Sequence, residues 1–500
     1  MQFFCPEISH SAQTLCLCVT GRAYTRKMTV KRHLINFRQR DIIVGNSIRV
    51  HIPPTRGQEV KLLKRLLPLV FAALLVSSCS SASVEELLSP PRSDGEQTEI
   101  YEALRSFTND DITLKYPRSG QYRSAFVVKN LDGELTDEAI VFYERPNVSD
   151  GSSLRMNFLD KQNGKWVSTY DFAATGSEVE NVTFRDLGDG FETIVVNYLV
   201  QNSSDRSTSV FTYKNGFPEE LMSIRNIYAG ILDVNGDEND ELFTISSGRS
   251  SGSQMAGFYG WQDNSFVRLG QTPLSSSLAS VKDVSCGSCD KVGTRAVFVD
   301  HAFSDGSFST DALIYSRNYF YLSPAMNGTA ASRISNTYTP YMKCSDIDED
   351  GTTEIPSTIP FPDYEELPNA EQVNQTIWYS LEKTGTSIKE KYRSFAGTKG
   401  DYMFIFPEIW KDKVTAAVSV SEGIVTFYEY SLITKTTGSV ILTIYGAAEG
   451  NTAKYENNGE LLFLGKSGQT GYSYYAGIGT GRLAPNEIQL NELFLIDRPV

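Results

Sequence analysis

The sequence predicts a mainly β protein, and three observations support this fold class. Of its 500 residues, 26 are Tyr and 27 are Phe, and such aromatic residues favour strands. Long stretches of helical period are few. A short acidic loop recurs along the middle of the chain, and each time it runs into an apolar, strand-like segment. We therefore expect repeated antiparallel sheets, followed by a smaller C-terminal domain.

The first 59 residues are expected to lie outside the folded protein. They hold nine Lys/Arg, three Asp/Glu and three of the seven Cys, without a sustained helical or strand period. An export signal starting at Val60 would have the ordinary length. Residues 1–59 are therefore predicted to be upstream translation, with a disordered basic extension as the alternative.

Residues 60–78 have the pattern of a lipoprotein signal peptide. A basic patch precedes an apolar run from Leu66 to Val76, which is far shorter than the roughly 20 residues of a membrane-spanning helix. Val76-Ser-Ser-Cys79 resembles the bacterial lipobox, which implies lipid on the Cys79 thiol and a place on the extracytoplasmic side of the cell membrane. The alternative is an ordinary secretory signal with an incidental cysteine. Residues 79–98 are polar and are predicted to be a disordered tether.

Without its first 79 residues, the chain has 34 Lys/Arg and 57 Asp/Glu, a net charge near −23. This charge argues against nucleic acid as a partner, since contacts with phosphate would be repulsive. It suits a protein that collects calcium. The one remaining histidine, His301, leaves little scope for His-dependent catalysis.

Three acidic loops share one pattern, with oxygen-bearing side chains at positions 1, 3, 5 and 9 before an apolar segment. Calcium takes six to eight oxygen ligands, so alternate side chains turned into a tight loop can form its cage. A turn without metal is the alternative. The predicted ligands of structural calcium are Asn130, Asp132, Glu134, Glu138, Asp233, Asn235, Asp237, Glu241, Asp346, Asp348, Asp350 and Glu354.

Two degenerate copies, Asp186–Glu192 and Asp283–Lys291, complete a series of five loops. Their spacing is near the period of a four-stranded propeller blade, about 40–50 residues before insertions. The second copy is two residues short, and the fourth lacks oxygen ligands at several positions, so we expect no ion in the fourth.

The loop pattern followed by an apolar strand resembles the FG-GAP/VCBS repeats of integrin-type β-propellers, over roughly Ile112–Phe395. The resemblance implies a β-propeller over residues 99–395, with at least five blades and calcium in the intact loops. A terminal strand often completes the last blade of a propeller, and Ile112–Tyr116 is the candidate. Before it, Ile100, Leu104 and Phe107 lie at helical spacing and predict a short helix.

The fourth copy contains Cys286 and Cys289, and Cys344 lies two residues before the fifth loop. A disulfide or thiol cluster could replace the missing ion as a staple; idle thiols are the alternative. A redox pair or zinc site lacks the βαβ context and the fourth ligand.

Residues 397–500 are predicted to form an α+β domain. A last helix is expected after an N-cap at Asn486, with Ile488, Leu493 and Phe494 facing inward. A run of tyrosines either lines a carbohydrate or peptide groove or alternates between core and surface, and the second is favoured; these are Tyr472, Tyr474 and Tyr475. The predicted strands are Val414–Val420, Ile424–Tyr430, Val440–Tyr445, Leu461–Leu464 and Tyr472–Ile478.

These patterns favour a non-enzymatic, lipid-anchored lipoprotein, a monomer whose propeller acts as a binding or scaffold module for a protein or a cell-wall glycan. The alternatives are a propeller-type glycan-active enzyme with paired carboxylates and an envelope-assembly scaffold. The sequence contains no His-Glu-x-x-His motif, and no catalytic residues are predicted.

Overall fold

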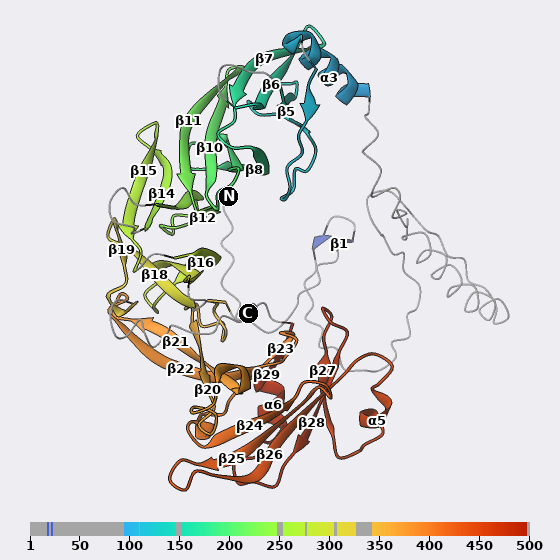
Figure 1. The fold of residues 1–500 in the computed structure, drawn as a ribbon, viewed down its shortest axis with the longest axis vertical. Helices are drawn as coiled ribbons and strands as arrows, with labels where there is room; N and C mark the ends of the chain where they lie inside the picture. Colours follow the sequence, from blue (N-terminus) through green and yellow to red (C-terminus); the bar gives the residue numbers. More distant parts are fainter. Residues whose placement is uncertain are drawn as a thin grey trace, which may run out of the picture. The chain divides into compact units, whose positions relative to one another are not determined.

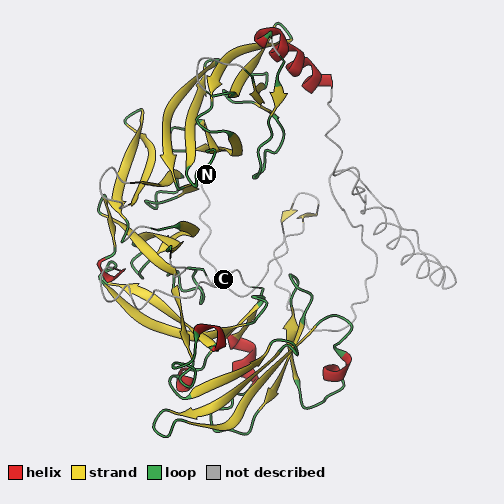
Figure 2. Ribbon diagram, in the orientation of Figure 1, coloured by secondary structure: helices red, strands yellow, loops and turns green. Residues whose placement is uncertain are grey.

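The computed structural model describes residues 18–19, 22–23, 95–109, 111–146, 152–247, 254–275, 278–304, 308–326 and 343–497 (Figures 1 and 2). The chain divides into two compact units, Met1–Arg92 and Ser93–Val500. In the first unit, two short strands, β1 (Cys18–Val19) and β2 (Arg22–Ala23), pair in antiparallel fashion. The predicted signal peptide and Cys79 lie outside the described residues.

The second unit opens with helix α3 (Gly95–Thr108), which confirms the predicted short helix. Ile100 and Leu104 are buried and pack on one face of the first sheet. Phe107 is 46% exposed, and Thr108 is buried instead, so the inward face lies one residue further along than expected. No helix of the described residues is both long and apolar enough to span a membrane.

The first sheet has strand order β3-β5-β6-β7, with β4 also paired to β5. The prediction that Ile112–Tyr116 completes the last sheet is wrong, because β3 pairs with β5 of this first sheet. Two short strands, β3 and β4, pair with different parts of β5. The predicted terminal strand therefore pairs with a strand close to it in the sequence. Its strands are β3 (Thr113–Leu114), β4 (Phe126–Lys129), β5 (Glu138–Glu144), β6 (Leu154–Gln162) and β7 (Lys165–Ala173).

The next three sheets are four-stranded antiparallel meanders, in which each strand pairs with its neighbour in the sequence. The second holds β8 (Glu178–Asp186), β9 (Glu192–Leu199), β10 (Arg206–Lys214) and β11 (Phe217–Asn226). The third holds β12 (Tyr228–Leu232), β13 (Glu241–Ser247), β14 (Gln254–Gln262) and β15 (Ser265–Pro273). The fourth holds β16 (Ser280–Ser288), β17 (Arg295–Ala302), β18 (Phe308–Ser316) and β19 (Tyr319–Leu322).

The fifth sheet joins the middle of the chain to its C-terminal end. Its last strand, β29, pairs with β23. Both strands belong to the region from residue 397 onward that was predicted to be a separate C-terminal domain, so this sheet crosses the predicted domain boundary. Its strands are β20 (Ile355–Pro360), β21 (Asn374–Glu382), β22 (Ser387–Ala396), β23 (Tyr402–Ile405) and β29 (Phe494–Ile496). Three short 3-10 helices lie at Pro324–Met326, Asn369–Glu371 and Glu408–Trp410.

The sixth sheet confirms the five strands predicted for the C-terminal region, in the order β24-β25-β26-β28-β27. Helix α6 has the predicted N-cap at Asn486, with a capping box to Gln489. Ile488 is 69% exposed, however, and Leu490 faces inward in its place. The elements are β24 (Val414–Ser419), β25 (Ile424–Ser431), β26 (Thr436–Ala447), α5 (Ala453–Glu456), β27 (Leu462–Lys466), β28 (Ser473–Ile478) and α6 (Glu487–Leu493).

Four sheets share one irregularity, which identifies them as structural repeats. The register shifts at Phe158/Leu159, Val210/Phe211, Phe258/Tyr259 and Trp378/Tyr379, each time between the second and third strands after the acidic loop. Such a bulge increases local twist. The repeat seen in the sequence of the loops therefore extends to the pairing of the strands.

Hydrophobic clusters join each sheet to the next one along the chain. Separate clusters lie between sheets one and two, two and three, three and four, four and five, and five and six. Helix α3 covers the other face of the first sheet. The architecture is thus mainly β, with several antiparallel sheets. None of the hydrophobic clusters formed by the described residues joins the first sheet to the fifth, so closure of the sheets into a ring is not confirmed.

Candidate metal sites

The three intact loops share a buried glutamate at position 9. Glu138 begins β5 and Glu241 begins β13, in each case the strand that follows the loop, and Glu354 immediately precedes β20. All three residues are at most 3% exposed. Each carboxylate accepts a hydrogen bond from the backbone N–H of loop position 2, namely Leu131 at 2.7 Å, Val234 at 2.8 Å and Ile347 at 3.1 Å. The ligand spacing in the sequence therefore corresponds to one repeated local geometry.

Burial makes a negative charge costly at these glutamates. Desolvation, reinforced by Asp132 and Asp160, raises the pKa of Glu138 to about 7, although the Leu131 N–H opposes it. Desolvation, together with Asp237 and Asp233, likewise raises the pKa of Glu241 to about 7 against the Val234 N–H. A cation placed among these oxygens would stabilise the ionised carboxylates.

Position 1 of each loop shapes the turn. Asn130 Oδ1 accepts the N–H of Gly133 at 2.6 Å, and Asp233 Oδ1 accepts that of Gly236 at 2.7 Å. Both glycines have φ near +80°, where a side chain would be strained. The side chain at position 1 thus closes the turn in these two loops by accepting the N–H three residues on.

The first loop has no basic partner. Asp132 accepts backbone N–H groups from Glu134 at 3.1 Å and from Gly216 of the second sheet at 3.3 Å. No ammonium or guanidinium group of the described residues contacts Asp132, Glu134 or Glu138. Asn130 donates its amide to the Glu134 carbonyl. No side chain of the described residues therefore neutralises the carboxylates of this loop.

At position 3, the third loop has an amide side chain where the other two intact loops have carboxylates. Asn235 Nδ2 donates to Glu241 Oε1 at 2.6 Å and to Asp237 Oδ2 at 3.0 Å. Arg295 lies at the edge of the loop, where its Nη2 donates to the Asp233 carbonyl at 2.7 Å and lies 3.5 Å from the Asp233 carboxylate. Among the described residues, neither Asp237 nor Glu241 has a lysine or arginine partner. The amide brings these two acidic side chains toward one point.

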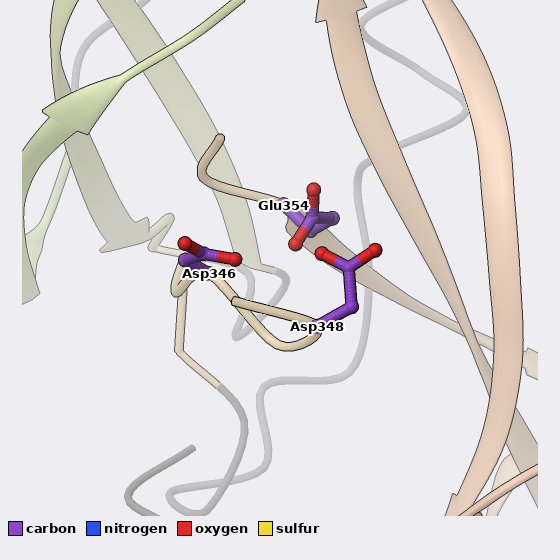
Figure 3. Close-up of side chains that lie close together, drawn as sticks. All are labelled: Asp346, Asp348 and Glu354. Carbon is purple, nitrogen blue, oxygen red and sulfur yellow. The ribbon is translucent and has the colours of Figure 1, made fainter. Parts of the chain in front are cut away.

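In the fifth loop, Asp346, Asp348 and Glu354 each offer a carboxylate oxygen, and these atoms lie within 4.8 Å of one another. Figure 3 shows the three carboxylates gathered around one region. Sequence reasoning missed a fourth participant, Lys391 of β22, whose Nζ lies 3.0 Å from Asp348, 2.8 Å from Asp350 and 2.8 Å from Glu354. Although burial opposes it, the hydrogen bonds to these carboxylates raise the pKa of Lys391 above its usual value.

The second, degenerate loop is also closed by lysines. Asp186 Oδ1 accepts three backbone N–H groups at 2.9–3.1 Å. Lys214 contacts Asp189 at 2.7 Å, and Lys129 of the first sheet contacts Glu192 at 3.0 Å. The Asp189 and Glu192 carboxylates therefore already have cationic partners.

The predicted fourth copy is misplaced. Residues 283–288 lie in strand β16, and the turn between β16 and β17 comes later, where Asp290 Oδ1 accepts the N–H groups of Val292 and Thr294 at 3.2 and 3.0 Å. The Ser, Cys and Gly residues that resemble a turn alternate across the two faces of β16 instead. The expectation that this copy has no ion cage stays a prediction.

The predicted cysteine staple is wrong. Cys286, Cys289 and Cys344 are free thiols. Cys286 packs between sheets three and four, whereas Cys289 and Cys344 pack between sheets four and five, so the first two thiols lie on opposite sides of one sheet. Burial raises the pKa of the Cys286 thiol to about 11, which keeps it protonated and unreactive.

The tyrosine run belongs to the core. Tyr474 and Tyr475 are each 3% exposed, and the Tyr474 hydroxyl donates to the buried Asp401 carboxylate at 2.6 Å. Tyr472 is half-buried, with the Lys399 ammonium 4.4 Å from its ring centre. Tyr474 and Tyr475 are therefore buried on opposite faces of β28, so the predicted alternation of core and surface positions does not hold for them. Tyr472 and Tyr474 line a small pocket together with Lys399 and Tyr402.

Asp300 of β17 is a buried acid that sequence reasoning missed, because nothing near it in the chain marks it as a site. It is 6% exposed and accepts hydrogen bonds from the Thr310 hydroxyl and, at 3.7 Å, from the Cys344 thiol. Desolvation raises its pKa to about 6, although the Thr310 hydrogen bond opposes this. No lysine or arginine of the described residues contacts this carboxylate.

We expect Asp300→Asn to flatten the pH dependence of stability. A carboxyl whose pKa rises on folding binds its proton more tightly in the folded state, so stability falls as pH rises from about 4 to about 6. The variant should be more stable than the parent by about 1–3 kcal/mol at pH 7–8 and close to it at pH 4. Urea denaturation in chelator at both pH values measures this. The exposed Asp111→Asn is the control, and an equal pH dependence in parent and Asp300→Asn would contradict the prediction.

No protein-family model matches the sequence, and no curated protein matches it. The exotype rhamnogalacturonan lyase YesX aligns over 66% of this chain and 74% of its own, with 10% identity and a TM-score of 0.27. The rhamnogalacturonan lyase YesW aligns over 71% and 79%, with 11% identity and a TM-score of 0.27. A putative 6-phosphogluconolactonase from Bacteroides fragilis aligns over 65% and 92%, with 10% identity and a TM-score of 0.21. Similarity at these scores supports no conclusion about activity.

Proposed function

We propose that this protein is an extracytoplasmic, lipid-anchored lipoprotein whose calcium-stabilised β-propeller acts as a binding or scaffold module for a protein or a cell-wall glycan. One observation carries the calcium part of the proposal. In three loops, each leading into a different sheet, a buried glutamate at position 9 accepts a hydrogen bond from the backbone N–H of position 2. A turn that holds no cation, whether a metal ion or an ammonium group, has no need of a desolvated carboxylate at position 9.

The loops at 130–138 and 233–241 are the best candidates for calcium. Each offers side-chain oxygens at positions 1, 3 and 5 in addition to its buried glutamate, and calcium accepts such mixed sets of carboxylate, amide and backbone oxygens. Glu138 and Glu241 lack basic partners among the described residues. A divalent cation would supply the missing positive charge and hold together the two strands that each loop joins, β4 with β5 and β12 with β13.

The propeller part of the proposal is supported by the repeats. Three sheets are four-stranded meanders, four carry a bulge in the equivalent hairpin, and consecutive sheets bury their faces against each other. Stacked four-stranded blades have these properties. The lipid anchor is supported by the sequence around Cys79 alone, and mass measurement of the protein extracted from membranes, parent against Cys79→Ser, tests it.

Calcium should raise the thermal midpoint of the protein, and chelator should lower it. A ligand that binds only the folded state, present at 100 times its Kd, adds about 2.7 kcal/mol. Differential scanning calorimetry with calcium and with chelator measures the shift. An identical midpoint in both conditions, with no calcium retained after dialysis, would overturn the calcium sites.

Glutamine substitutions assign the effect to the loops. Glu138→Gln and Glu241→Gln keep the shape of the side chain and an acceptor for the Leu131 or Val234 N–H, so the metal-free fold should persist, but each should abolish the calcium-dependent gain from its own loop. Glu238→Gln is the matched control, since Glu238 is exposed at position 6 of the third loop. A calcium response unchanged in both test variants would contradict the assignment.

A further inference from the structure

The ammonium group of Lys391 lies inside the fifth loop, among the acidic side chains that would otherwise surround an ion. It projects from β22, the third strand of the same sheet, and its side chain is 17% exposed. Its three contacts are with loop positions 3, 5 and 9, which are the Asp348, Asp350 and Glu354 carboxylates at 2.8–3.0 Å. These positions alternate along the loop and are the ones assigned to a metal.

The ammonium group of Lys391 has as many N–H donors as there are carboxylates in contact with it. A lysine ammonium has three N–H donors and no acceptor, and here each carboxylate takes one of the three short contacts. The next nearest oxygen, Thr352 Oγ1, lies 3.5 Å away. Glu354 is fully buried, so an unpaired charge there would be strongly unfavourable. Lys391 supplies its partner.

The loops therefore fall into two groups. The first and third loops have buried glutamates without a lysine or arginine partner among the described residues. The second and fifth loops hold lysines against their carboxylates, as shown by the Lys214–Asp189 and Lys391–Glu354 pairs. The neighbouring Tyr392 supports the fifth loop further, because its hydroxyl donates to Asp348 Oδ2 at 2.6 Å.

We propose that Lys391 is the built-in cation of the 346–354 loop, so that this loop closes without a metal ion and binds calcium only when the lysine is removed. This inference deepens the proposed function and rests on it for the contrast with the other loops. A tethered ammonium competes with free calcium from within the same sheet, which gives it a high effective concentration. Lys291 also approaches Asp350, at 3.8 Å, but its side chain is 83% exposed.

Lys391→Met should create a calcium site. The variant keeps the length of the side chain and removes its charge, and it should retain one more calcium ion per chain than the parent after equilibrium dialysis against a fixed calcium concentration. Terbium, a luminescent calcium substitute, should gain emission excited through Tyr392. Lys389→Met is the matched control, since Lys389 lies on the same strand with its side chain 68% exposed, and it should match the parent. An equal ion count in Lys391→Met and parent would overturn the proposal.

A second variant keeps the test decisive if Lys391→Met does not fold. Glu354→Gln in the parent background should leave the calcium count unchanged, because the loop holds no ion. Loss of one ion per chain in Glu354→Gln would overturn the proposal and assign a metal to this loop. The outcomes also separate the two proposals: a parent that binds no calcium contradicts the proposed function, whereas the difference between Lys391→Met and parent decides the role of Lys391.

Discussion

Replacing Arg155 with methionine should lower the free energy of unfolding by about 3–5 kcal/mol, because it leaves a buried charge without its partner. Arg155 and Asp171 face each other on β6 and β7, with side chains 8% and 9% exposed. The guanidinium donates through Nε at 2.9 Å and through Nη2 at 2.6 Å to the same carboxylate oxygen. This charge-assisted pair is the most deeply buried arginine–carboxylate contact among the described residues.

The remaining contacts of Asp171 explain why the loss is large. Its other oxygen accepts the Tyr143 hydroxyl at 2.8 Å and the Asn157 amide at 3.3 Å. These neutral donors cannot replace the positive charge of the arginine. Removing both charged groups, in Arg155→Met/Asp171→Asn, should therefore restore part of the stability that Arg155→Met loses.

Urea denaturation measures these differences in the free energy of unfolding. Arg185→Met is the control, since the Arg185–Asp240 pair is 3.7 Å apart and its side chains are 62% and 39% exposed, and such surface pairs contribute about 0–1 kcal/mol. If Arg155→Met loses less than the control does, the buried pair has no special role in holding β6 to β7.

The second large effect is expected for Trp410→Ala, at about 3–5 kcal/mol. Trp410 is fully buried, with ring centres 5.3–5.5 Å from those of Phe404, Phe406 and Phe427. Phe404 belongs to the fifth sheet and Phe427 to the sixth, so the indole fills the space between the two sheets. Its N–H donates to the Leu483 carbonyl at 2.7 Å, and alanine would lose this contact as well.

The adjacent Ile409→Ala is a matched control, because Ile409 lies in the same 3-10 helix and is 53% exposed. It should change stability by about 0.5 kcal/mol or less. Chemical denaturation followed by tyrosine and tryptophan fluorescence, together with circular dichroism, measures both variants. A loss in Trp410→Ala no larger than that in Ile409→Ala would show that the two sheets do not depend on this side chain.

The strands were predictable because local pattern determines them. Alternation of apolar and polar residues located all five strands of the sixth sheet, and the cap at Asn486 located the start of α6. The errors are local as well. Residues 283–288 have the composition of a turn but lie in a strand, and Ile488 lies at the right spacing but faces outward. Composition alone does not distinguish a turn from a strand edge, nor one side of a short helix from another.

The candidate sites were predictable in part. The spacing of oxygen side chains located Glu138, Glu241 and Glu354, but their burial depends on strands that pack over them. Lys391 lies 37 residues after Glu354 in the chain, on another strand of the sheet. No local pattern relates the two residues, because the pairing of β20, β21 and β22 brings them together.

The sequence by itself determined the repeat and the positions of four of the five loops, because each follows from residues close together in the chain. The tertiary structure alone decided where the terminal strands pair, which faces the cysteines occupy and which loop holds an ammonium group at its centre. The physical reason is that burial and charge pairing depend on groups distant in sequence. The fifth loop has the acidic spacing of the other two, and one lysine from β22 makes its electrostatics different.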